Sequence, residues 1–281
     1  RVYVSGKAGV QVHDLATGTS DRRFLPGEAK AMTAIRGDIW MSVYTLAYLF
    51  RMAPDGEPQR VTTIGNEQTR PLDNAYSPAD QTLVVGTEPE YGRYGGAVSL
   101  YNVSTGALDV YRNIITDQSV RSVATRPGEV YLGSTIVNGY GTTPRATEAR
   151  LAGFDLATRS KRWEIVPVPG AKQIVDLVTV GNRLYGVTDT GTLFVVDTRT
   201  HQVTATSTVA AGQTTMVLVD DVIYGTSGKD IWRLDPDSLS VTPFVTGLNA
   251  QWYGASALLT AAPDGSALYA LRGRNLVRVQ L

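Results

Sequence analysis

Apolar and polar residues alternate along most of the chain in runs of a few residues, which is the period of half-buried β-strands. No segment of useful length shows the spacing of an amphipathic helix. The clearest stretch is 184–206, where three apolar runs are separated by Asp189-Thr190-Gly191 and by Asp197-Thr198-Arg199-Thr200. Turns of this composition join antiparallel strands. Because the same pattern returns along the sequence, it indicates a repeated structural unit rather than a site.

A short step marks this repeat: an apolar residue, an aromatic or apolar residue and then a small residue, with one further apolar residue before the small one in four of the seven cases. It stands at Val2-Tyr3-Val4-Ser5, Ile39-Trp40-Met41-Ser42, Leu83-Val84-Val85-Gly86, Val130-Tyr131-Leu132-Gly133, Leu184-Tyr185-Gly186, Ile223-Tyr224-Gly225 and Leu268-Tyr269-Ala270. The gaps between the middle residues are 37, 44, 47, 54, 39 and 45 residues. In the complete units one strand-like run precedes the step and two follow it. Four strands at a spacing of roughly forty residues predict a β-propeller of seven four-stranded antiparallel blades.

We therefore predict one all-β domain over residues 1–281, with blades at about 1–28, 29–64, 65–114, 115–170, 171–210, 211–250 and 251–281. The first and last blades are incomplete, because Arg1 enters at a second strand and Leu281 ends at a third strand. We expect the native chain to carry roughly one more hairpin before Arg1, whose first strand completes the last blade.

Three turns between strands share a phrase, and it is one that known propellers also use. The phrases are Asp14-Leu15-Ala16-Thr17-Gly18, Asn102-Val103-Ser104-Thr105-Gly106 and Asp155-Leu156-Ala157-Thr158-Arg159. They resemble the turns of YncE-like and quinoprotein-like (PQQ-like repeat) bacterial propellers. In quinoprotein repeats a tryptophan after such a turn docks against the neighbouring blade, and Trp163 matches that placement in one blade. The resemblance implies this architecture and a bacterial protein of the cell envelope or the extracellular space, but no quinone pocket is recognisable.

Composition excludes several classes of function. The chain holds 26 basic and 26 acidic side chains, no cysteine and two histidines. This balance lacks the basic footprint of a nucleic-acid binder, and no apolar run is long enough to insert into a membrane. Since cysteine is absent and His13 and His201 lie in separate turns, we predict no metal site and no cofactor.

Two long insertions break the regular pattern of short turns. They are Glu88–Gly96 in blade three and Ile136–Glu148 in blade four, and both connect the second and third strands, so both are expected on one face. They mix glycine with the candidate ligand-binding residues Tyr91, Arg93, Tyr94, Tyr140, Arg145 and Glu148. Tyrosine offers a flat amphipathic surface with a hydroxyl, and arginine a planar fork suited to carboxylates.

The connections between blades are expected on the same face. They add the amides of Gln118 and Gln173, the guanidinium of Arg70, and the aromatic pair Trp252 and Tyr253. Stacking aromatics with convergent hydrogen-bonding groups suit a polar ligand such as a saccharide.

Three interpretations of these loops stay open. The tyrosines could pack on one another and cap the blades, they could form a binding surface, or they could form a catalytic site. As a binding or scaffold module, the protein would recognise a polysaccharide or another protein without catalysis. It would be a monomer or part of a larger multidomain chain.

As an enzyme, it would be a polysaccharide lyase or a glycoside hydrolase on the same face. In the lyase, Arg93 or Arg145 would neutralise a uronate, and Tyr91, Tyr94 or Tyr140 would serve as base or acid. In the glycosidase, Glu90 and Glu148 would be the paired carboxylates. A quinoprotein dehydrogenase would require metal-coordinating acids at the channel mouth, which the sequence does not reveal.

Overall fold

The protein is an all-β, seven-bladed β-propeller, as the sequence predicts. A computed structural model describes residues 1–248 and 258–281. Seven antiparallel sheets follow one another along the chain in that part, five of four strands and, at the beginning and the end, two of three strands. Each sheet is built from strands consecutive in sequence, which is the topology of propeller blades.

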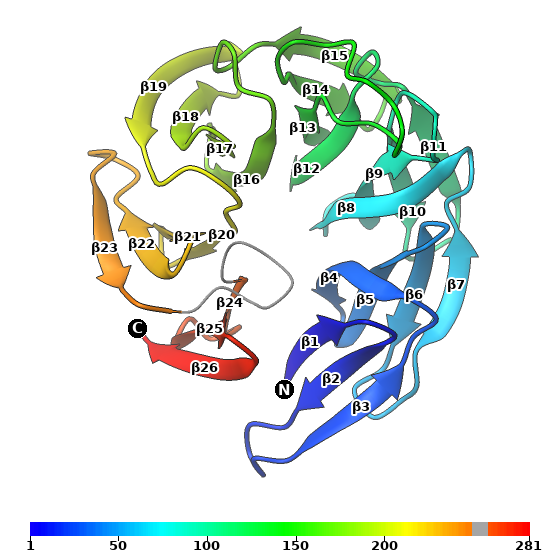
Figure 1. Cartoon of the computed structure of the whole chain (residues 1–281), viewed down its shortest axis with the longest axis vertical. Helices are drawn as coiled ribbons and strands as arrows, with labels where there is room; N and C mark the ends of the chain where they lie inside the picture. Colours follow the sequence, from blue (N-terminus) through cyan, green and yellow to red (C-terminus); the bar gives the residue numbers. More distant parts are fainter. Residues whose placement is uncertain (249–257) are drawn as a thin grey trace. The chain divides into compact units, whose positions relative to one another are not determined.

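The first four blades (Figure 1, blue to green) contain fifteen of the strands in the described part. Their bounds are β1 Val2–Gly6, β2 Gly9–His13 and β3 Ser20–Phe24; β4 Glu28–Ile35, β5 Asp38–Tyr44, β6 Tyr48–Met52 and β7 Gln59–Thr63; β8 Gln68–Ser77, β9 Thr82–Pro89, β10 Ala97–Asn102 and β11 Leu108–Arg112; and β12 Ser119–Arg126, β13 Glu129–Thr135, β14 Leu151–Asp155 and β15 Ser160–Ile165.

The last three blades (Figure 1, green to red) contain eleven described strands. Their bounds are β16 Ile174–Val180, β17 Arg183–Thr188, β18 Thr192–Asp197 and β19 Gln202–Thr208; β20 Met216–Val219, β21 Val222–Ser227, β22 Asp230–Leu234 and β23 Val241–Val245; and β24 Leu259–Ala261, β25 Ala267–Arg272 and β26 Asn275–Gln280.

The chain falls into two compact units. The first is Arg1–Thr147 with Ala152–Glu164, and the second is Glu148–Leu151 with Ile165–Leu281. Blades one to four therefore belong essentially to the first unit and blades five to seven to the second. In the first unit the opening strands of blades two, three and four, β4, β8 and β12, are neighbours (Figure 1).

The hydrophobic core lies between neighbouring blades within each unit. In the first unit, one cluster joins blades one and two, a second blades two and three, and a third blades three and four. Trp40 belongs to the second cluster, is 5% exposed, and lies with its ring centroid 5.4 Å from that of Tyr101. Two further clusters occupy the same positions between the blades of the second unit.

Within residues 1–248 and 258–281, no helix has the length and apolar character needed to cross a membrane.

Candidate functional site

The two long loops lie where the sequence predicts them, between the second and third strands of their blades. Residues 90–96 connect β9 with β10, and residues 136–150 connect β13 with β14. Residues 136–147 belong to the first unit together with the whole of the blade-three loop. The contacts between the two loops described next therefore lie within the first unit.

Main-chain hydrogen bonds join the two loops directly. The Gly92 N–H donates to the carbonyl of Tyr140 at 2.9 Å, and the Gly139 N–H donates to the carbonyl of Arg93 at 3.2 Å. A Cβ atom on Gly139 would stand 1.8 Å from the carbonyl oxygen of Glu90. Glycine at this position thus permits the close approach of the loops, and the pair forms one continuous surface.

Two tyrosines project from this surface, and we call Tyr91 and Tyr140 the tyrosine platform. Their ring centroids lie 5.5 Å apart with the planes inclined at 51°. The side chains nevertheless remain 59% and 77% exposed. The two tyrosines thus pack on one another, as one interpretation expects, and the binding surface stays a prediction. The rings are fixed by their mutual contact and by the backbone bonds beneath, yet their faces are accessible.

Tyr94 and Arg145 form a second aromatic contact in the same loops. The Tyr94 hydroxyl donates to the carbonyl of Thr143 at 2.8 Å, and the Arg145 guanidinium lies 3.8 Å from the centroid of the Tyr94 ring. Arg145 also pairs with the Asp117 carboxylate at 3.3 Å. Its charge is thus engaged by both a ring face and a carboxylate.

Arg93 is likewise paired. Its guanidinium lies 3.4 Å from the Glu67 carboxylate, and Arg112 pairs with the other oxygen of the same carboxylate. Glu67 also accepts, at its backbone carbonyl, a hydrogen bond of 2.8 Å from the Glu90 N–H. Glu67 thus ties the connection between blades two and three to the blade-three loop.

Behind Tyr91 lies a set of four polar side chains that we call the Tyr44 cluster: Lys30, Tyr44, Arg70 and Glu88. The Tyr44 hydroxyl lies 3.0 Å from the Tyr91 hydroxyl, and the Arg70 guanidinium lies 4.7 Å from the Tyr44 ring centroid. Arg70 on β8 and Glu88 on β9 are directly opposite in the strand register. Lys30 lies 5.9 Å from the Tyr44 ring centroid and forms an ion pair with Glu28 at 2.8 Å.

Burial and charge shift the acidities of this cluster in opposite directions. Glu88 is only 8% exposed, and burial raises the pKa of its carboxyl, although Arg70 and Lys30 oppose that shift. Hydrogen bonds from Tyr91 and Arg70 lower the pKa of Tyr44. The hydrogen bond with Tyr44 raises the pKa of Tyr91. Either hydroxyl of the tyrosine pair can be the donor.

Sequence reasoning selected Arg70 but missed Lys30, Tyr44 and Glu88. Tyr44 is the last residue of a second strand, and Glu88 is the next-to-last residue of another. Both therefore stand on the face already assigned to the long loops, and that position was the signal that could have found them. The burial that alters Glu88 depends on the packing of neighbouring strands and has no such signal.

The remaining predicted residues lie elsewhere or outside the described residues. Gln118 is 1% exposed, accepts a hydrogen bond from the Ser134 hydroxyl, and holds the Gly96 N–H with its backbone carbonyl, so it supports the loop from below. Glu148 and Gln173 belong to the second unit, where the Glu148 carboxylate accepts a hydrogen bond of 3.1 Å from the Gly170 N–H. Trp252 and Tyr253 fall outside the described residues. The ligand contacts assigned to these residues stay predictions.

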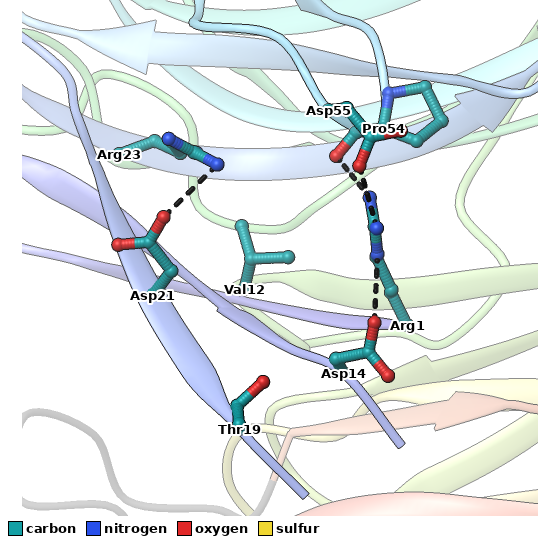
Figure 2. A pocket seen from close by; sticks show the side chains of 8 residues that line it. All are labelled: Arg1, Val12, Asp14, Thr19, Asp21, Arg23, Pro54 and Asp55. Atoms are coloured by element: carbon teal, nitrogen blue, oxygen red, sulfur yellow. Dashed lines mark hydrogen bonds and ion pairs between the residues drawn. The ribbon is translucent and has the colours of Figure 1, made fainter. Parts of the chain in front are cut away.

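A separate small pocket lies at the turns of blades one and two (Figure 2). Its lining is Arg1, Val12, Asp14, Thr19, Asp21, Arg23, Pro54 and Asp55. Arg1 pairs with Asp14 at 3.4 Å and with Asp55 at 2.6 Å, and Arg23 pairs with Asp21 at 3.0 Å. Since both guanidinium groups face carboxylates, these contacts hold the turns together. No group of three His, Cys, Asp or Glu side chains in the described part of the chain converges as metal ligands would.

No protein-family model matches this sequence, and no curated protein is detectably similar to it.

Proposed function

We propose that the protein is a non-catalytic binding module that recognises a polysaccharide on the loop face of blades three and four. The observation that carries the proposal is the tyrosine platform, two exposed rings fixed by backbone hydrogen bonds between two loops. Tyrosines present a large contact area and lose little conformational entropy on binding. Their flat faces stack on sugar rings while their hydroxyls remain available for hydrogen bonds.

Rigid loops on a rigid scaffold also limit what binding costs. A surface whose side chains are already ordered loses less entropy when it takes up a ligand. Here Tyr91 is held by Tyr44 and Tyr140, and Tyr94 is held by Thr143 and Arg145. The face therefore has the preorganisation of a binding surface.

Binding has more support than catalysis. The lyase interpretation requires Arg93 or Arg145 to neutralise a uronate, but each already faces a carboxylate of the protein, Glu67 or Asp117. In the glycosidase interpretation Glu90 and Glu148 would be the paired carboxylates, and the Glu148 carboxylate is engaged by the Gly170 N–H. We also propose, from the turn phrases alone, a kinship with YncE-like and quinoprotein-like bacterial propellers and a place in the cell envelope or the extracellular space.

The test is glycan-array binding with the purified chain and three variants. We expect Tyr140→Ala and Tyr94→Ala to reduce binding by tenfold or more, because each removes an aromatic ring from the face. The matched control is Phe24→Ala, since Phe24 is an aromatic side chain, 69% exposed, on the outer strand of blade one. Equal binding by all four proteins would remove the loop face as the site. If the purified chain bound other proteins and no glycan, it would be a protein scaffold. If it released unsaturated sugar products from a polysaccharide, it would be a lyase.

A further inference from the structure

The charged side chains around the tyrosine platform are paired within the protein. On the loops, Arg93 and Arg112 share the Glu67 carboxylate, and Arg145 faces Asp117. These pairs come from different segments of the chain, because Glu67 precedes β8 whereas Asp117 precedes β12. The connections that lead into blades three and four thus each supply one carboxylate. These carboxylates face the arginines of the two long loops and of β11.

The Tyr44 cluster contains one ion pair and one cation that stands opposite a carboxylate in the strand register. Lys30 forms its ion pair with Glu28 on the same strand, and Arg70 stands opposite Glu88 in the β8–β9 register. The Coulombic attraction of Arg70 and Lys30 acts directly on Glu88. From β4 to the blade-four loop, each of these cationic side chains therefore lies near a carboxylate of the protein.

A paired surface of this kind attracts anions weakly. The fields of opposite charges a few ångströms apart largely cancel beyond about one Debye length, so a polyanion gains little steering on approach. At contact, a ligand carboxylate could reach Arg93 or Arg145 only by displacing Glu67 or Asp117. That exchange replaces one exposed ion pair with another, and such a pair contributes only about 0–1 kcal/mol.

Apart from the charged side chains, the face offers groups of the kind that bind sugar hydroxyls. The platform offers two ring faces, and the hydroxyls of Tyr44 and Tyr91 can each donate or accept a hydrogen bond. Ring faces and tyrosine hydroxyls, beside arginines that already face carboxylates of the protein, complement an uncharged polyhydroxyl ligand.

We propose that the tyrosine platform recognises a neutral polysaccharide, with one sugar ring on Tyr91 and Tyr140 and the hydroxyls of a neighbouring sugar at the Tyr44 cluster. This inference rests on the proposed function and specifies its ligand class. It differs from the expectation that the loop arginines recognise acidic sugars. The pairing of Arg93 with Glu67 and of Arg145 with Asp117 is the reason for the difference.

The first experiment compares polymers that differ in charge. Affinity would be measured by calorimetry for polygalacturonate, its carboxyl-reduced galactan and hyaluronan, with amylose, β-1,3-glucan and xylan as further neutral polymers. We expect at least one neutral polymer to bind, at least tenfold tighter than either acidic one, and with less than about a twofold change between low and high salt. Tighter, salt-sensitive binding of an acidic polymer would overturn the inference while leaving the proposed function standing. Binding of none of these polymers would remove the proposed function itself.

The second experiment releases the arginines from their carboxylates. In the double variant Glu67→Gln and Asp117→Asn, Arg93, Arg112 and Arg145 lose their ion-pair partners while the side-chain shapes are kept. We expect this variant to gain about tenfold or more in affinity for polygalacturonate, with the gain lost at high salt and neutral binding unchanged. The control is Asp109→Asn. Asp109 lies on β11, the outer strand of blade three, and its carboxylate is the ion-pair partner of Arg159. No gain, or an equal gain in the control, would show that pairing does not determine ligand charge.

Discussion

The carboxylate of Asp73 on β8 accepts a hydrogen bond of 2.8 Å from the backbone N–H of Val123 on β12, and so joins blade three to blade four. Its other oxygen accepts the N–H of Asn74 at 2.8 Å. The second unit repeats the device: the Asp176 carboxylate accepts the N–H of Met216 at 2.6 Å from the next blade. Both aspartates follow an irregularity in the strand register, which frees a side chain to reach across.

Asp73 makes the stability of the protein depend on pH in an unusual direction. Burial raises the pKa of its carboxyl to about 6 from a usual value of 3.8, despite the hydrogen bonds from Val123 and Asn74 and the attraction of Arg121. The folded state thus holds this proton more tightly than the unfolded state does. The contribution of Asp73 to the free energy of unfolding should therefore increase as the pH falls from about 6 to 4, by about 3 kcal/mol at most.

The measurement is urea unfolding at several pH values between 4 and 7, for the wild type and for Asp73→Asn. Surface carboxylates with lowered pKa values, such as those of Asp14 and Asp155, lose stabilising contacts as the pH falls and act in the opposite sense. The difference between the two proteins removes that common background. A difference that stays constant over this range would show that the Asp73 carboxyl titrates normally.

In two blades, an aromatic ring of the adjacent strand explains why the repeated step ends in glycine. A Cβ atom on Gly225 would stand 2.1 Å from the Trp232 ring, and one on Gly186 would stand 2.2 Å from the Phe194 ring. In both blades the ring comes from the adjacent third strand. The Gly225→Ala substitution should therefore cost about 1–3 kcal/mol of stability through overpacking.

A double-mutant cycle with Trp232→Leu checks this explanation. The leucine variant alone loses buried ring area and should cost about 2–4 kcal/mol, whereas the double variant should cost clearly less than the sum of the single changes. Gly56→Ala serves as the control, because its nearest neighbours would lie 3.4 Å away or more. Strict additivity between Gly225→Ala and Trp232→Leu would contradict the contact.

Much of this architecture could be predicted because it is periodic. Steps such as Ile223-Tyr224-Gly225 recur along the chain, and the turn aspartates Asp14 and Asp155 accept backbone N–H groups in the manner that their sequence positions indicate. The bridges of Asp73 and Asp176 were not predictable in this way. Each depends on a register irregularity in one strand and on the spacing between two blades, and neither feature leaves a period in the sequence.

The candidate site was predictable only in outline. Loop length, glycine and tyrosine content identified Tyr91 and Tyr140 and the face that carries them. The partners of Arg93 and Arg145 could not be read from the sequence, because Glu67 and Asp117 lie in other connections that reach the loops only in the folded protein. Those partners decide the charge of the surface, and with it the class of ligand that we propose.

The Glu129 carboxylate binds two aromatic side chains of blade four, Tyr131 and Trp163. Its carboxylate accepts the Tyr131 hydroxyl at 2.7 Å and the Trp163 indole N–H at 3.2 Å. Trp163 packs over Gly153 of its own blade. Glu129→Gln should cost less than about 0.5 kcal/mol, because an amide can accept from the indole and donate to the hydroxyl, whereas Glu129→Ala should cost about 1–3 kcal/mol. Thermal unfolding of both variants measures this, and equal losses would mean that the charge, not the geometry, matters.

The side chain of Asn138 couples the two loops. Substituting it tests whether the stability of the loop face contributes to glycan binding. Asn138 is buried, its Oδ1 accepts the Gly95 N–H at 3.0 Å, and its Nδ2 donates to the carbonyls of Asp117 at 2.7 Å and Ile136 at 3.2 Å. Asn138→Ala leaves the Gly95 N–H without this acceptor, which should cost about 1–3 kcal/mol of stability.

The same substitution should also weaken glycan binding about tenfold, although Asn138 itself is buried and the tyrosines are unchanged. The reason is that the loops then have to be ordered when the ligand binds, and this entropy opposes association. Tyr140→Ala gives the complementary pattern, because a ring that is 77% exposed can be removed with little loss of stability but with loss of the stacking surface. Unfolding and binding would be measured on both variants side by side. Full affinity in a destabilised Asn138→Ala protein would show that the coupling of the loops plays no part in recognition.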